Sequence, residues 1–138
     1  MKFGLMNDIL IPEVEAAYVD NHTEISCSEQ NQKIIAARDV MEILSGKWKI
    51  QILAALMFKG NMRFMDLMRM VNGIGAKMLS KELHDLEANQ LVKRTVLPTK
   101  PITVDYAITP YGKTLRNVIN TIVNWGINHR KTIMRDDE

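Results

Sequence analysis

The chain has 138 residues and a formal net charge of +2, and its 46% hydrophobic and 25% charged residues suit one globular domain with its own core. The longest apolar run, residues 52–58, is too short to span a membrane, and acidic residues interrupt any signal-peptide core near the N-terminus. A single cysteine excludes an internal disulfide, and three scattered histidines supply no metal or catalytic spacing. We therefore expect a cytoplasmic protein that is not an enzyme and that holds no metal or cofactor.

The charge is divided unevenly along the chain. Residues 1–33 hold Lys2 and Lys33 against six acidic residues, a net charge of −4. The other residues hold sixteen basic and ten acidic side chains, a net charge of +6. A basic body behind an acidic leader is typical of proteins that bind a polyanion. We expect an acidic N-terminal extension over residues 1–33 and a single domain over residues 34–135.

Apolar residues at helical spacing predict three helices in the next part of the chain. They cover residues 34–44, 47–60 and 64–71. Residues 61–64, between the second and the third, can form a short strand. The Asn-Gly-Ile-Gly segment at residues 72–75 then breaks the helical pattern.

A fourth helix is predicted over residues 76–88, and its two sides differ chemically. At about 100° per residue, Leu79, Leu83 and Leu86 fall on one side. Polar and charged residues fall largely on the other: Lys77, Ser80, Lys81 and His84. Two strands rich in β-branched residues follow over 91–97 and 102–108, joined by Pro-Thr-Lys-Pro.

The last helix is predicted to begin near Thr109, which can cap it with Pro110 in the first turn. Its apolar stripe is too wide for one packing partner and comprises Leu115, Val118, Ile119, Ile122, Val123 and Trp125. The first helix, over residues 34–44, supplies a second apolar face. Twofold pairing would bury both faces, so we expect a homodimer that forms through the first and last helices.

This order of elements predicts a mainly α fold with a small β-hairpin wing, an α+β winged helix-turn-helix. The two short helices over residues 64–71 and 76–88, joined by a tight glycine-containing turn, form the helix-turn-helix. The hairpin directly behind the second of them forms the wing.

Residues 72–77 place two glycines and a lysine before a helix, as a nucleotide-binding loop would. A P-loop, however, needs G-x-x-x-x-G-K-[ST] after a strand. Here the glycines are two apart, Met78 follows Lys77 where a hydroxyl is needed, and a helix precedes the loop. A helix N-terminus beside a lysine still favours an anion. The anion that we expect is the phosphate backbone of DNA, with the exposed side of the helix in the major groove.

Each of these residues has a simpler interpretation. Lys77 and Lys81 could form a solvated helix face, as charged faces usually do. Lys100 could be an exposed loop residue. His84 lies two turns into the helix, and a surface role and a DNA contact are about equally supported for it.

Five segments together resemble the HxlR-type winged-helix transcriptional regulators of the MarR-like group. They are ILSGKWKIQIL, MRFMDL, GIGAKMLSKELHDLEANQLVKR, PITVDYAIT and VNWG, in order within residues 34–126. The resemblance implies a bacterial or archaeal DNA-binding regulator that acts as a homodimer on a palindromic operator. Carried over by position, the DNA-facing residues at the start of the recognition helix would be Ala76, Lys77, Ser80 and Lys81. Thr99 and Lys100 would form the wing tip.

The sequence departs from the family pattern at several positions. Met65 stands where a small polar helix cap is common, and Asn89-Gln90 replaces the usual Asp-Gly turn. Ile34 and Ile35 occupy the place of the cysteine through which several relatives sense oxidants, so we expect no redox sensing there. A small-molecule effector of unknown identity stays open. So does the alternative that the winged helix binds a protein instead of DNA.

Overall fold

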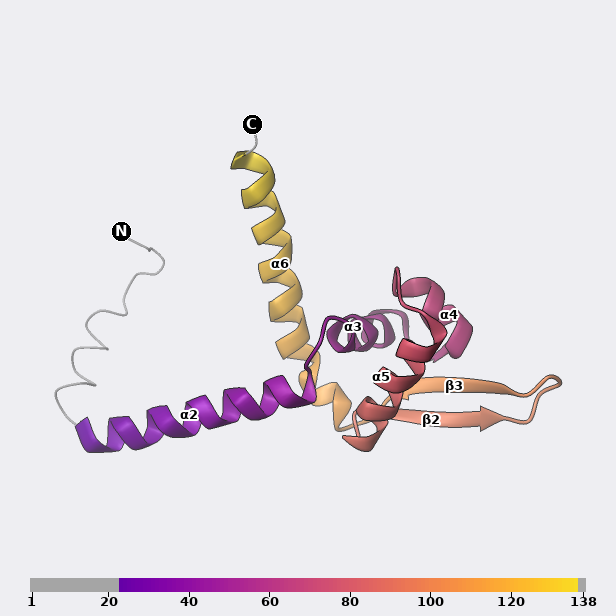
Figure 1. Ribbon diagram of the computed structural model, residues 1–138, viewed down its shortest axis with the longest axis horizontal. Coiled ribbons are helices and arrows are strands. Elements are labelled where there is room, and N and C mark those ends of the chain that lie inside the picture. Colours follow the sequence, from indigo (N-terminus) through magenta and orange to yellow (C-terminus); the bar gives the residue numbers. More distant parts are fainter. Residues whose placement is uncertain (1–22, 137–138) are drawn as a thin grey trace. The chain divides into compact units, whose positions relative to one another are not determined.

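The computed structural model describes residues 23–136 of the chain, with side chains over residues 27–135 (Figure 1). The described chain divides into two units after Glu42. The first unit carries helix α2 (Thr23–Ile43), and the last residue of α2 opens the second unit. None of the described helices is both long and apolar enough to cross a membrane.

Helix α2 begins at Thr23, so the prediction that the first helix starts at Ile34 is wrong. Residues 23–33 contain neither glycine nor proline, but they lack the apolar periodicity by which a helix is recognised in a sequence. The rest of the predicted extension lies outside the described residues. From Cys27 to Glu42 every residue of α2 is exposed.

The second unit confirms the predicted winged helix-turn-helix. Its elements are α3 (Lys49–Lys59), β1 (Met62–Arg63), α4 (Phe64–Met70), α5 (Ala76–Ala88), β2 (Val92–Leu97), β3 (Thr103–Ile108), the 3-10 helix η2 (Gly112–Leu115) and α6 (Arg116–Asp136). Helices α4 and α5 and the turn over residues 71–75 form the helix-turn-helix, and the β2–β3 hairpin forms the wing (Figure 1).

The strands form one antiparallel sheet in the order β1-β3-β2. The hairpin pairs Val92 with Ile108 at its base and Leu97 with Thr103 near its loop. Strand β1 pairs with the other edge of β3, which confirms the short strand predicted within residues 61–64. The sheet therefore joins the start of α4 to the middle of β3, where Met62 and Arg63 pair with Tyr106 and Asp105.

One apolar core holds the second unit together. Its fully buried side chains are Ile52, Leu53, Leu67, Leu79, Leu83, Leu86, Val92 and Ile119. Burial of each such side chain stabilises the fold by roughly 1.5–3 kcal/mol. The predicted apolar side of α5 is thus confirmed, and the opposite side of this helix faces solvent.

Helix α5 ends in a Schellman motif whose left-handed residue is Gln90, with φ at +63°. The Leu91 N–H donates to the Leu86 carbonyl at 3.0 Å, and the Gln90 N–H donates to the Glu87 carbonyl at 2.9 Å. Glycine usually occupies such a position, because a side chain strains a left-handed backbone. The sequence therefore places a glutamine, under backbone strain, where glycine is favoured.

The last helix does not begin near Thr109 as predicted, because η2 comes first and α6 begins at Arg116. Thr109 instead bonds to the first residue of η2. Its hydroxyl accepts a hydrogen bond from the Gly112 N–H at 2.8 Å and donates to the Gln90 carbonyl at 2.6 Å. The Thr109 N–H also donates to the Leu91 carbonyl at 3.1 Å. A Cβ on Gly112 would overlap the Leu91 carbonyl oxygen, so the close approach at this junction requires glycine.

Candidate nucleic-acid interface

Helix α5 presents its polar side to solvent along its whole length. The exposed residues on that side include all five that the sequence proposes for DNA contact: Ala76, Lys77, Ser80, Lys81 and His84. The side chains of Leu79, Leu83 and Leu86 fix this orientation, because they are buried on the opposite side. The core therefore determines which side of α5 a ligand can reach.

The first turn of α5 is open to an anion. Its N-cap is Gly75, which has no side chain that could accept a hydrogen bond from the first N–H groups, and the turn contains no acidic residue. Lys77 lies in this turn and is exposed. Free N–H groups, the positive end of the helix dipole and a lysine together favour a phosphate.

The loop between β2 and β3 forms the tip of the wing, at the far end of the hairpin in Figure 1. The Thr99 hydroxyl donates to the Pro101 carbonyl at 2.8 Å and lies 3.0 Å from the Thr103 hydroxyl. Thr99 therefore orders the loop. Lys100 is exposed beside it and is the group at the tip that can reach a phosphate.

An open groove of about 480 Å³ lies between the start of α4 and the start of β3. Met65 and Ile102 contribute apolar walls, and Arg63 and Arg69 line the groove as well. The Arg69 guanidinium is paired with Asp66 at 2.7 Å. Arg63 adds a basic residue near the wing that the sequence did not mark, because a strand of two residues leaves no periodic pattern.

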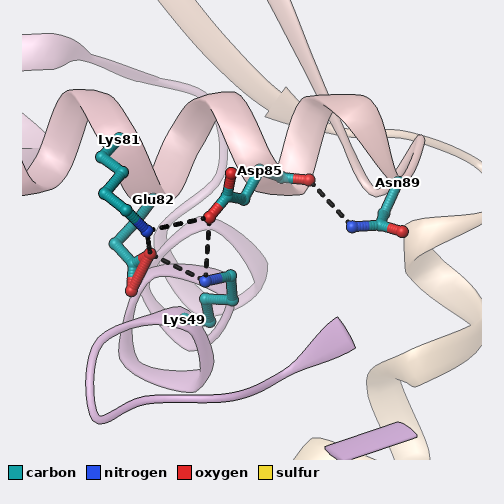
Figure 2. Close-up of polar contacts among 5 residues, drawn as sticks. All are labelled: Lys49, Lys81, Glu82, Asp85 and Asn89. Carbon is teal, nitrogen blue, oxygen red and sulfur yellow. Dashed lines mark hydrogen bonds and ion pairs between the residues drawn. The ribbon is translucent and has the colours of Figure 1, made fainter. Parts of the chain in front are cut away.

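Two lysines and two carboxylates form a closed ring of alternating charge between α3 and α5 (Figure 2). Lys49 Nζ lies 2.7 Å from Glu82 Oε2 and 3.3 Å from Asp85 Oδ2. Lys81 Nζ closes the ring, at 3.3 Å from Asp85 Oδ2 and 3.9 Å from Glu82 Oε2. The ring carries no net charge and connects α5 to α3.

The members of the ring differ in burial. The side chains of Lys49 and Glu82 are 7% and 5% exposed, whereas that of Lys81 is 65% exposed. Burial lowers the pKa of Lys49, but hydrogen bonds and attraction to Glu82 and Asp85 outweigh burial and raise this pKa above its usual value. Burial raises the pKa of Asp85, but hydrogen bonds from Lys81 and Lys49 outweigh it and bring this pKa below its usual value. Both groups are therefore charged at neutral pH.

The sequence does not identify this ring, although it contains one signal for it. Glu82 falls on the same side of α5 as Leu79 and Leu86. A carboxylate on a buried side needs a cationic partner, but helical periodicity cannot show that the partner is Lys49, 33 residues away. Within the described residues, no three His, Cys, Asp or Glu side chains gather as they would around a metal ion.

Residues 43–134 match the HxlR-like helix-turn-helix family. The chain is 32% identical over 108 residues to YtcD, an uncharacterized HTH-type transcriptional regulator of Bacillus subtilis (strain 168), with 78% of this chain and 85% of that protein covered. It is similar to the structure of the redox regulator HypR in its reduced form, with a TM-score of 0.66 and 29% identity over 72% of this chain and 98% of that one. A structure described as a MarR-family regulator from Porphyromonas gingivalis W83 gives a TM-score of 0.60 and 33% identity over 66% and 88% of the two chains.

Proposed function

The chain belongs to the HxlR-like helix-turn-helix family of transcriptional regulators, and on that premise we propose that it binds a palindromic operator as a cytoplasmic homodimer. Each protomer places α5 in the major groove and the wing loop on the neighbouring backbone. The observation that carries this proposal is the exposed basic side of α5, which begins at a helix N-terminus without a side-chain cap.

The proposed contacts follow from the chemistry of each side chain. Lys77 in the first turn and Lys100 at the wing tip meet phosphates, whose recognition is independent of sequence. Ser80 is short and suits a base edge, and Ala76 permits close approach to the groove. Lys81 reaches a phosphate or a base edge. His84 lies further along α5 and meets the edge of the groove, and Thr99 holds the loop that presents Lys100.

The dimer is supported by apolar surface that the described chain leaves uncovered. Helix α6 exposes Val118, Ile122, Trp125, Ile127, Ile133 and Met134, with Trp125 67% exposed. Helix α2 separately exposes Ile34, Ile35, Val40 and Met41. Twofold pairing through these helices covers apolar surface and sets the two copies of α5 about 34–36 Å apart, one turn of DNA.

The test is selection of duplexes from a random-sequence pool, followed by binding measurements at several salt concentrations. We expect a palindromic sequence to be enriched. Replacing Lys77 or Lys100 with alanine should weaken binding to every duplex and lower the salt slope by about one. Lys113→Ala is the matched control, because Lys113 is exposed on η2, outside the proposed face. A protein-binding module would enrich no sequence and show no such slope.

A further inference from the structure

Lys81 differs from the other lysines of the proposed interface in its partners. Its ammonium lies 3.3 Å from Asp85 and 3.9 Å from Glu82. Lys77 and Lys100 make no ion pair with any described residue. Lys81 is nonetheless 65% exposed, so its stem can swing the ammonium out toward a ligand. Lys81 therefore has two competing partners, a carboxylate on its own helix and a group on DNA.

Lys81 can leave the ring without depriving either carboxylate of an ion-pair partner. When its ammonium moves out, Asp85 and Glu82 both keep Lys49, which is buried against them at 3.3 Å and 2.7 Å. The interaction that Lys81 loses is its exposed ion pair with Asp85, four residues away on the same helix. Such a pair shifts an equilibrium only about twofold. Asp85 is therefore a weak competitor for Lys81, and it matters most where the gain from DNA is also small.

We propose that Asp85 is a specificity-determining residue that acts through Lys81, an inference that rests on the proposed function. In a nonspecific complex the helix has no fixed register, phosphates remain hydrated, and Asp85 keeps Lys81 from a sequence-independent contact. On the operator the register of α5 is fixed, so that a base edge comes within hydrogen-bond distance of Lys81. A good contact of this kind favours the correct base about fivefold or more. Operator DNA therefore outcompetes Asp85, whereas nonspecific DNA does so only in part.

The experiment compares two duplexes of equal length and composition, the selected sequence and a scrambled one. Dissociation constants are measured at several salt concentrations for the wild type, Asp85→Asn, Lys81→Ala and the double variant. Glu87→Gln is the matched control, because it removes the same charge from an exposed position of α5 that makes no ion pair with a described residue. Thermal unfolding of each variant shows that the fold is retained.

We expect Asp85→Asn to tighten binding to the scrambled duplex by about twofold for each bound protomer and to steepen its salt slope by up to one. Binding to the selected duplex should change less, so the specificity ratio falls. In the Lys81→Ala background, Asp85→Asn should have little effect on either duplex. Glu87→Gln should leave the ratio as in the wild type.

Three results would overturn the inference. One is an equal gain on both duplexes, or the same gain in Glu87→Gln, since either is a general effect of charge. Another is an effect of Asp85→Asn that persists without Lys81, since that reports on the position or stability of α5. The third is no change on the scrambled duplex. Failure of the proposed function looks different, because the wild type itself would then fail to prefer any duplex.

Discussion

Replacing Lys49 with methionine tests the ion-pair ring most directly. Methionine keeps most of the volume of the side chain and removes the ammonium that lies 2.7 Å from Glu82 and 3.3 Å from Asp85. Removing one partner of a buried pair typically costs about 3–5 kcal/mol. Two features reduce this value here, because Lys81 remains 3.9 Å from Glu82 and the side chain of Asp85 is 38% exposed. We therefore expect a loss of about 2–4 kcal/mol in the free energy of unfolding.

Urea denaturation at neutral pH and fixed protein concentration measures this loss through the midpoint and slope of the transition. Lys59→Met is the matched control, because Lys59 is exposed in the last turn of the same helix and should change stability by only about 0.5 kcal/mol. Replacing Lys49 and Glu82 together with methionine should restore much of the loss, since no buried charge is then left without its partner. The reasoning is refuted if Lys49→Met is no more destabilising than Lys59→Met, or if the double variant loses the sum of the two single losses.

Four further predictions concern the turn after α5, the titration of the ring, the oligomer and the thiol. Gln90→Gly should raise the free energy of unfolding by about 0.5–1 kcal/mol, because it relieves a left-handed residue; a lower urea midpoint would contradict this. Since the pKa of Lys49 is raised and that of Asp85 is lowered, their contributions to stability should be lost only as the pH rises above 10.5 or falls below 3.8, respectively. Urea midpoints across pH check this, and Asp85→Asn should flatten the acidic limb. Light scattering should give a mass near twice 15.8 kDa, and a monomer that binds the selected duplex tightly would disprove the dimer. DNA binding by the wild type and by Cys27→Ser should respond alike to diamide, and a loss of binding that Cys27→Ser abolishes would show that the thiol is a sensor.

The sequence predicts the elements of the second unit well where local signals agree. Helix α5 spans Ala76–Ala88 as predicted, because its leucines follow the helical period and a glycine-containing turn precedes it. The start of α2 could not be predicted, since the polar stretch from Thr23 carries no periodic signal. The 3-10 turn η2 depends on the close approach of Gly112 to Leu91, which is a contact between distant parts of the chain.

The candidate site divides in the same way. The helical period of α5 predicts that Lys77, Ser80 and Lys81 are exposed, and the structure confirms this. Their contact with DNA stays a prediction. The ring between Lys49 and Glu82 could not be predicted, because the sequence does not state how α3 crosses α5. Periodicity shows which side of a helix is buried, whereas only tertiary packing shows which charge lies opposite.

The hydrogen bonds of Thr109 have a consequence beyond the start of η2. Its hydroxyl and N–H join three backbone groups, the Gln90 and Leu91 carbonyls behind α5 and the Gly112 N–H in front of α6. The turn after α5 and the first residue of η2 are therefore fixed to one residue. A displacement of η2 would have to carry the turn after α5 with it or break these hydrogen bonds. This junction therefore couples the segment before α6 to the turn behind the helix proposed to read DNA.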